Sequence, residues 1–199
     1  MKREWKILLI VLILVILIIA GHFGILKLQE KIILNTLDEI FVILKAGDIE
    51  SLKQYFNLDD ITNQEEVLQL INDNEDIVKA VVGNLNYEII DKDIKLNRSK
   101  IKLKISNKDL EKVCDKCVSK VITLSISQTF GFITEIEKNQ KLKEYIIEQL
   151  NSESIDVITN EVEILIAKED GNWQINYDKE ELINAILPGY KEAIKYLKK

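Results

Sequence analysis

The feature that most constrains this chain is an unbroken apolar run close to its N-terminus. Every residue from Ile7 to Ala20 is apolar, and the apolar character continues to Leu26 with only His22 interrupting it. Twenty helical residues rise roughly 30 Å, the thickness of the hydrocarbon core of a bilayer. A helix buried in a globular core fits poorly, because no polar face exists over the run. The sequence therefore predicts a membrane-spanning helix over residues 7–26.

Basic residues before the predicted span give it a direction. Lys2, Arg3 and Lys6 precede the apolar run, and Trp5 beside them suits the membrane interface. The positive-inside bias keeps this end in the cytoplasm and places the rest of the chain outside. We therefore expect residues 1–27 to form a cytoplasmic tip and a single-pass anchor.

A cleaved secretory signal is the alternative to an uncleaved anchor. Cleavage after Ala20 would leave Ile18 at position −3, where a small residue is normally required, so the anchor is favoured. No Cys directly follows the apolar run, which excludes a lipid attached to an N-terminal Cys. His22, the only histidine, lies near the outer end of the span and is expected among the lipid headgroups, not in a functional site.

The remainder of the chain has the composition of one acidic globular domain. Residues 1–27 hold four basic residues and one acidic residue, so the rest carries 23 basic and 32 acidic residues, a net charge of −9. Some 170 residues suffice for one domain with its own core. An acidic surface repels phosphate backbones, so nucleic acid is not an expected partner.

Helical periodicity dominates the first part of the domain. An i, i+3, i+4, i+7 pattern predicts an amphipathic helix over residues 28–46. A short helix follows over Ile49–Phe56, and a capping box at Thr62–Glu65 begins a third helix over about 64–82. The apolar face of the first helix comprises Ile33, Leu37, Ile40, Phe41 and Leu44.

Two pairs of segments then alternate apolar and polar residues, the pattern of strands with one buried face. Leu85–Ile89 and Lys100–Ile105 form one predicted hairpin. Ile155–Lys168 and Trp173–Tyr177 form another around an Asp-Gly turn. Strands grouped in hairpins predict antiparallel pairing and an α+β fold.

Helices separate and follow these hairpins. An apolar stripe predicts a helix that begins after Asp109, and Val121–Ser127 is read as its continuation although a strand is the alternative. Further helices are expected over about 134–150 and after Asp178, with a break at Pro188-Gly189. We divide the chain into residues 1–27, a domain over 28–187 and a helical extension over 188–199. The stripe consists of Leu110, Val113, Cys114, Cys117, Val118, Val121 and Ile122.

The order of these segments resembles the nuclear transport factor 2-like (cystatin-like) α+β superfamily, and within it bacterial envelope proteins and lipoproteins of unknown function. The residues that carry the resemblance are Leu44–Asp48, Tyr55-Phe56, Asn84–Tyr87, Ile101–Asp109 and Asp170–Ile175. The resemblance implies a curved antiparallel sheet packed on helices as a cone with an apolar cavity. It also implies the plasma membrane of a bacterium, and it makes Tyr87, Trp173 and Tyr177 candidates for lining the cavity.

Cys114-Asp-Lys-Cys117 is the one motif with chemical potential. A Cys-x-x-Cys pair can act as a redox dithiol, form a disulfide outside the cytoplasm or supply half of a zinc site. No further Cys exists to complete a zinc site, and the motif lies within a helix after an antiparallel hairpin, unlike a thioredoxin motif. Both thiols fall on the apolar stripe, which favours core cysteines; the disulfide or redox pair remains the alternative.

No other pattern predicts catalysis, a metal or a cofactor. The carboxylate pairs Asp59-Asp60, Glu65-Glu66 and Glu180-Glu181 lie at expected helix starts, where negative charge stabilises the helix dipole. The sequence thus predicts an extracytoplasmic module, not an enzyme, that binds an envelope protein or a small apolar ligand. A cavity-type enzyme of the same superfamily and a thiol sensor using Cys114 and Cys117 are the alternatives.

Overall fold

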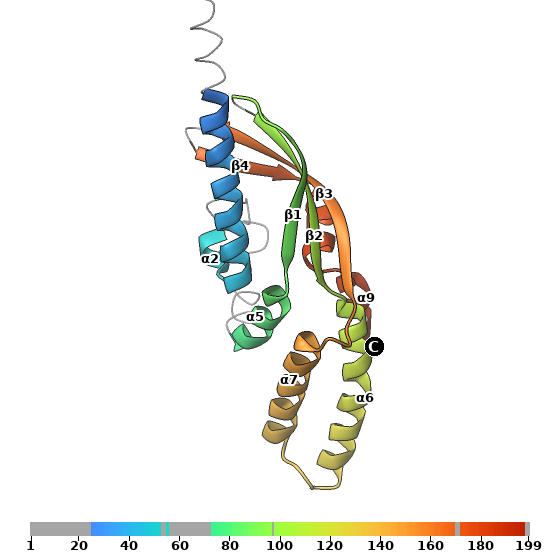
Figure 1. Cartoon of the computed structure of the whole chain (residues 1–199). Helices are drawn as coiled ribbons and strands as arrows, with labels where there is room; N and C mark the ends of the chain where they lie inside the picture. Colours follow the sequence, from blue (N-terminus) through green and yellow to red (C-terminus); the bar gives the residue numbers. More distant parts are fainter. Residues whose placement is uncertain (1–24, 53–54, 56–72, 97, 170–171, 198–199) are drawn as a thin grey trace, which may run out of the picture.

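A long amphipathic helix opens the part of the chain that the computed structural model describes, namely residues 25–52, 55, 73–96, 98–169 and 172–197 (Figure 1). This N-terminal helix covers residues 25–46, and Ile33, Leu37, Ile40 and Phe41 on its inner face are buried as predicted. The predicted membrane span falls almost entirely on residues 1–24, outside the described part. Among the described residues, no helix is both long and apolar enough to cross a bilayer.

Gly47 ends the N-terminal helix with a φ of +71°, a conformation that glycine adopts without strain. Asp48 then accepts a hydrogen bond from the Ser51 amide and starts α2 (Ile49–Leu52), which is shorter than the predicted Ile49–Phe56. The predicted capping box at Thr62–Glu65 and the start of the third helix lie outside the described residues.

The third predicted helix is represented by α5 (Glu75–Gly83), which follows Asn74 at its N-terminus. It corresponds to the second half of the helix that the sequence predicts over about 64–82. Val82 is its buried residue, and Leu85 just beyond it is also buried. The chain then enters the sheet.

Four strands form one open antiparallel sheet in the order β1-β2-β3-β4, which confirms the α+β class and the antiparallel pairing. The pairing of β2 with β3 across a long insertion was not predicted. The strands are β1 (Asn86–Asp93), β2 (Arg98–Lys108), β3 (Val157–Glu169) and β4 (Asn172–Tyr177).

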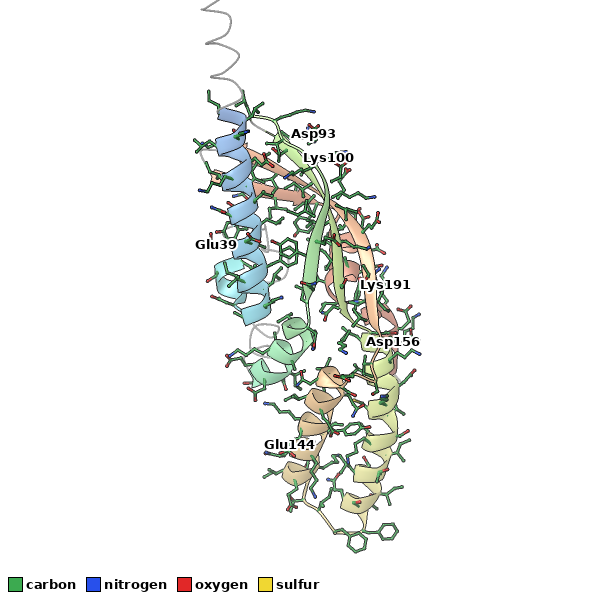
Figure 2. The ribbon with its side chains drawn as sticks, in the orientation of Figure 1. Glu39, Asp93, Lys100, Glu144, Asp156 and Lys191 are labelled. Atoms are coloured by element: carbon green, nitrogen blue, oxygen red, sulfur yellow. The ribbon has the colours of Figure 1, made fainter. Side chains whose placement is uncertain are left out.

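The two faces of the sheet differ in chemistry. One face contributes buried Ile101, Leu103 and Ile105 from β2, and the N-terminal helix packs against it. The opposite face carries ion pairs between neighbouring strands: Lys100 lies 2.7 Å from Glu163, and Lys102 lies 2.5 Å from Glu161. Figure 2 shows Lys100 on the side of the sheet away from the N-terminal helix. The alternation of apolar and polar residues in the sequence therefore corresponds to one buried face and one charged face of this sheet.

A helical hairpin is inserted between β2 and β3. It consists of α6 (Leu110–Thr129) and α7 (Glu135–Asn151), and residues 121–127 are helical as preferred over a strand. Gly131 turns the chain with a φ of +73°, and Thr134 caps α7 through a capping box with Glu137. The hairpin projects beyond the sheet, away from the residue-25 end of the N-terminal helix (Figure 1).

Two short helices complete the described chain. Asp178 caps α8 (Lys179–Ile186) by accepting a hydrogen bond from the Glu181 amide. Pro188-Gly189 separates α8 from α9 (Tyr190–Leu197), as predicted, with Gly189 at a φ of +78°. The last helix packs against α6 at the base of the hairpin.

Candidate functional site

The helical hairpin connects the end of β2 directly to the start of β3, and these two strands are paired with each other. The register places Lys108, the last residue of β2, opposite Val157, the first residue of β3. The Asp109 amide extends this pairing by donating to the Asp156 carbonyl at 3.0 Å. Both ends of the hairpin are thus fixed side by side at one end of the sheet.

Asn107, just before the hairpin, is a fully buried polar side chain. Its Nδ2 donates to the carbonyls of Val81 at 3.1 Å and Ile186 at 2.8 Å, and its Oδ1 accepts from the Lys108 amide at 2.8 Å. One side chain therefore ties β2 to α5 and α8. Buried polar groups with all partners present favour a single arrangement of the elements they join.

Lys108 and Asp109 complete what we call the polar joint, residues 107–109. The Lys108 ammonium donates to the carbonyls of Ser152 at 2.9 Å and Ile155 at 3.1 Å, at the end of α7. The Asp109 carboxylate caps α6 by accepting from the amides of Glu111 and Lys112. The polar joint therefore holds the start of α6 and the end of α7 in fixed positions.

The facing sides of α6 and α7 pack together. Near the joint, Val113 packs with Leu150 and Ile155 in a small apolar cluster that Cys117 borders. Farther along, the ammonium of Lys120 lies 5.1 Å from the centre of the Tyr145 ring, a cation–π contact between the helices. The hairpin thus has an inner face of its own.

Several apolar residues of α6 instead face solvent, contrary to the prediction that the stripe is an inward face. Val118, Val121 and Ile122 were expected to be buried and are exposed. Val113 and Leu124 are the buried residues of α6, whereas Val118, Val121 and Ile122 remain 40–57% exposed in the described chain. We call Val118, Ile122, Ile126 and Phe130 the outer stripe.

The end of the hairpin continues this apolar surface. Phe130 is 71% exposed and Phe132 is 78% exposed, with their ring centroids 6.2 Å apart. Ile136, in the first turn of α7, is 80% exposed. Contiguous exposed apolar groups on a soluble domain mark interaction sites, whereas single ones are ordinary.

Two features of α6 make this surface inexpensive to remove from water. No charged residue occurs between Lys120 and Glu135, although 30% of the chain is charged. The hydroxyls of Thr123, Ser127 and Thr129 donate to the backbone carbonyls four residues earlier, at 2.9–3.0 Å. Their donors remain satisfied when water leaves, so covering this surface costs little in lost hydrogen bonds. The absence of charge is the sequence signal that could have identified the surface.

Cys114 and Cys117 lie in the first half of α6 as two free, half-buried thiols. Burial, and secondarily the charge of Cys114, raises the pKa of Cys117 to about 11. Burial and then Asp115 raise the pKa of Cys114. Both effects reduce the thiolate at neutral pH, and thiolate is the reactive form. The predicted disulfide or redox pairing stays a prediction.

A small void lies beneath the N-terminal helix. It has about 20 Å³ and lies between Phe41, Leu103 and Ile175 among aliphatic neighbours. That volume holds about one water molecule, and a purely apolar lining offers it no hydrogen-bond partner. Organic ligands need pockets of roughly 300 Å³ or more, so this void does not support the cavity-enzyme alternative.

The three aromatic residues predicted to line a cavity have different positions. Tyr87 stacks on Phe41 and donates a hydrogen bond to Asp38, and Tyr177 packs at the edge of the main core. The backbone of Trp173 pairs with Lys168 in the sheet, and its side chain lies outside what the structure describes. Neither Tyr87 nor Tyr177 lines the small void beneath the N-terminal helix.

Metal-binding clusters are absent from the part of the chain that the structure describes: no group of three or more His, Cys, Asp or Glu side chains there could hold an ion. The Glu180-Glu181 pair lies in the first turn of α8, where the sequence placed it. Glu180 forms an ion pair with Lys191 of α9. The other two carboxylate pairs fall on residues outside the description.

Comparison with known proteins identifies no family. No protein-family model matches the chain, and no curated protein matches it. It is similar to the crystal structure of a lipoprotein-like protein, ycdA, from Bacillus subtilis, with 14% identity and a TM-score of 0.43. The match covers 64% of this chain and 42% of that one, so the chain spans less than half of that structure. At this TM-score the likeness carries no argument, and the resemblance to the nuclear transport factor 2-like superfamily is not confirmed.

Proposed function

We propose that this chain is a single-pass envelope protein that presents the α6–α7 hairpin as a protein-binding surface away from its membrane. Residues 7–26 are the anchor, the N-terminus is cytoplasmic and the α+β domain is extracytoplasmic, in the plasma membrane of a bacterium. The exposed apolar end of the hairpin, with Phe130 and Phe132 at 71% and 78% exposure, is the observation that carries the binding role.

The position of this surface supports the proposal. The described part of the N-terminal helix starts at residue 25, next to the end of the apolar run of the sequence, and the hairpin end lies at the far end of the molecule from it (Figure 1). A domain held by residues 7–26 would thus direct the hairpin outward. The polar joint, which fixes both ends of the hairpin, makes it a rigid support for a contact surface.

The size of the surface also supports a specific contact. A phenylalanine side chain buries roughly 200 Å² in a core or interface, so Phe130 and Phe132 together present roughly 300 Å². At about 25 cal/mol per Å², covering them would contribute roughly 7 kcal/mol before the costs of association are subtracted. Aromatic anchors of this kind dominate binding energy at protein interfaces.

One experiment tests membrane topology. Protease is added to intact cells or spheroplasts that express the full chain with a C-terminal epitope. We expect loss of the epitope in intact spheroplasts, and we expect the chain to stay with the membrane pellet after a high-salt wash. An epitope protected until lysis would contradict the extracytoplasmic placement. Release into the medium of a chain shortened by removal of its N-terminal segment would contradict the anchor.

A second experiment tests the binding surface. In-cell crosslinking is compared between the unmodified full chain and the double variant Phe130→Ser, Phe132→Ser. We expect the variant to lose its crosslinked protein partner while it stays folded and membrane-bound. Val42→Ser is the matched control, because Val42 is 68% exposed on the N-terminal helix, away from the hairpin. Equal crosslinking in both hairpin and control variants would contradict the proposed role.

A further inference from the structure

The partner that fits the outer stripe best is a second copy of this chain. We propose that two copies stand side by side in the same membrane and pack α6 against α6 through a two-fold axis. This inference rests on the proposed function, because the shared membrane orients both copies in the same direction. It specifies the partner of the same hairpin surface.

The outer stripe is self-complementary in shape. Val118, Ile122, Ile126 and Phe130 are spaced four residues apart, so they form one continuous ridge along the i±4 direction of α6. The row on one side consists of small residues, namely Ser119, Thr123 and Ser127. A ridge of large apolar side chains beside a groove of small ones can receive an identical ridge from another copy.

The second flanking row has the same character. It continues from Val121 through Ser125 to Thr129, again at four-residue spacing. Ridges of this class interlock with one another at a crossing angle near −50°. An isologous contact requires such a surface to match itself, and a two-fold dimer is the commonest assembly of identical chains.

Charge also favours a second copy at this position. The whole chain has a net charge of −6, so two copies repel one another across most surfaces. Between Lys120 and Glu135 no charged residue opposes close approach. The hydroxyls of Thr123, Ser127 and Thr129 donate within their own helix, so these three side chains can lose water and keep their donated hydrogen bonds.

The helix that follows the turn argues against insertion of the hairpin into a lipid bilayer. Glu135 and Glu137 lie in the first turn of α7, three and five residues after Phe132, and the Glu137 carboxylate is held in the capping box of α7. Hydrocarbon would have to surround these carboxylates, which is costly. A protein surface that covers α6 alone leaves both of them in water.

The exposed area is sufficient for a dimer contact. A stable interface buries about 800 Å² on each partner, and the two phenylalanines supply roughly 300 Å² of it. The rest comes from exposed apolar residues of α6, which are Val118, Val121, Ile122 and Ile126. The hairpin therefore offers enough surface without help from the sheet.

Charge substitution at the centre of the ridge tests the dimer. The full chain is solubilised in a mild detergent, and its mass is measured by density-matched sedimentation equilibrium. We expect a dimer for the unmodified chain and a monomer for Ile126→Glu, with a dissociation constant at least about tenfold higher. Val42→Glu, an equally drastic change on an exposed residue of the N-terminal helix, should leave the dimer unchanged.

A mixing experiment tests the two-fold arrangement. Ile126→Glu and Ile126→Lys chains are each expected to be monomeric and to retain the circular dichroism of the unmodified chain. Mixed in equal amounts they should form a heterodimer, since opposite charges then meet across the axis. Failure of the mixture to associate would overturn the two-fold contact through residue 126.

Further outcomes distinguish failure of the dimer from failure of the proposed function. A dimer that persists in Ile126→Glu would assign association to another surface, such as residues 7–26. A monomeric unmodified chain whose Phe130 and Phe132 still capture a different envelope protein would overturn the dimer and keep the proposed function. The anchored chain can also be mixed with a second population of vesicles. If it floats with these vesicles only when the hairpin is unmodified, the hairpin binds a lipid surface and not a second copy. A protease-protected C-terminus would overturn the extracytoplasmic function whatever the mass measured in detergent.

Discussion

The ring of Tyr87 on β1 lies flat against the ring of Phe41 on the N-terminal helix, with centroids 3.9 Å apart and an angle of 17° between the rings. The Tyr87 hydroxyl also donates to Asp38 of the same helix. A stacked pair and a hydrogen bond together fasten this helix to the edge of the sheet.

The Tyr87 contact predicts a loss of stability at alkaline pH. Burial, followed by the hydrogen bond and charge of Asp38, raises the pKa of Tyr87 well above its usual value near 10. The folded chain thus holds the phenol proton more tightly than the unfolded chain. The resulting stability is complete below about pH 10 and is lost as the pH rises toward the folded pKa.

Urea unfolding of the full chain at several pH values above about 9 measures this effect. We expect the free energy of unfolding to fall with pH, and to fall less steeply in Tyr87→Phe and in Asp38→Asn. Burial also raises the pKa of Tyr177, and burial with the Glu39 hydrogen bond raises that of Tyr55, so part of the slope should persist. Identical slopes in all three proteins would contradict the assignment to Tyr87.

Replacing Asn107 should destabilise the chain strongly. Asn107→Ala leaves the half-buried carbonyls of Val81 and Ile186 without their donor and removes the acceptor of the buried Lys108 amide. Each unsatisfied buried group costs about 1–3 kcal/mol, so we expect a loss of about 3 kcal/mol in denaturant unfolding. Asn176→Ala, at an exposed position of β4, should change stability by less than about 0.5 kcal/mol. Similar losses of stability for both variants would contradict the contribution that we assign to the Asn107 hydrogen bonds.

Two glycines should respond oppositely to alanine. A Cβ at Gly189 would lie 2.7 Å from the Asp109 carboxylate and 2.8 Å from the Glu111 amide nitrogen, at a φ of +78°. Gly189→Ala should therefore lower the melting temperature by displacing the cap of α6. A Cβ at Gly83 meets nothing within 4 Å in a helical position, so Gly83→Ala should be neutral or stabilise by up to about 1 kcal/mol. Thermal unfolding distinguishes the two, and stabilisation by both changes would contradict the close approach of Gly189.

The cysteines should react slowly in the folded protein. With the pKa of Cys117 near 11, its thiolate fraction at pH 8 is roughly two-hundredfold below that of an unshifted thiol near 8.5. We expect thiol-reactive dye to modify it correspondingly slowly, and faster by about tenfold for each pH unit up to pH 10. Rapid native labelling would support the thiol sensor. Fewer than two titratable thiols in unfolded protein taken from membranes would confirm the disulfide.

The outer and inner faces of the hairpin should differ in their effect on stability. Phe130→Ser with Phe132→Ser should change the unfolding free energy of dilute, monomeric protein by less than about 0.5 kcal/mol, since both rings are exposed. Leu124→Ala, at a buried position of the same helix, should cost about 2–3 kcal/mol. A large loss in the phenylalanine variant would mean that these rings stabilise the fold and do not serve recognition.

Local pattern predicted the elements of this fold well. The alternation at Ile101–Ile105 gave β2 and its buried face, and Asp109, Thr134 and Asp178 cap helices because their oxygens accept from free backbone amides. The pairing of β2 with β3 lay beyond local pattern, because a whole helical hairpin separates the two strands in the chain.

The candidate surface was harder to predict for a physical reason. Periodicity reports that residues share a face of a helix, but not whether another element covers that face. Val118 and Ile122 continue the spacing of Val113 and Leu110, yet the turn of the helix carries them out of contact with α7. The ligand cavity that the superfamily resemblance implies stays a prediction, and the small void of about 20 Å³ beneath the N-terminal helix does not supply it.

The side-by-side ends of β2 and β3 make the length of the hairpin independent of the sheet. Removing two turns from both α6 and α7 would leave the Lys108–Val157 register as it is and shorten the reach of the molecule by roughly 10 Å. Insertions or deletions of whole helical turns in α6 and α7 would therefore change the length of the hairpin in regular steps. With the membrane anchor that we propose, they would set how far the hairpin end lies from the lipid surface, while the pairing of β2 with β3 stays the same.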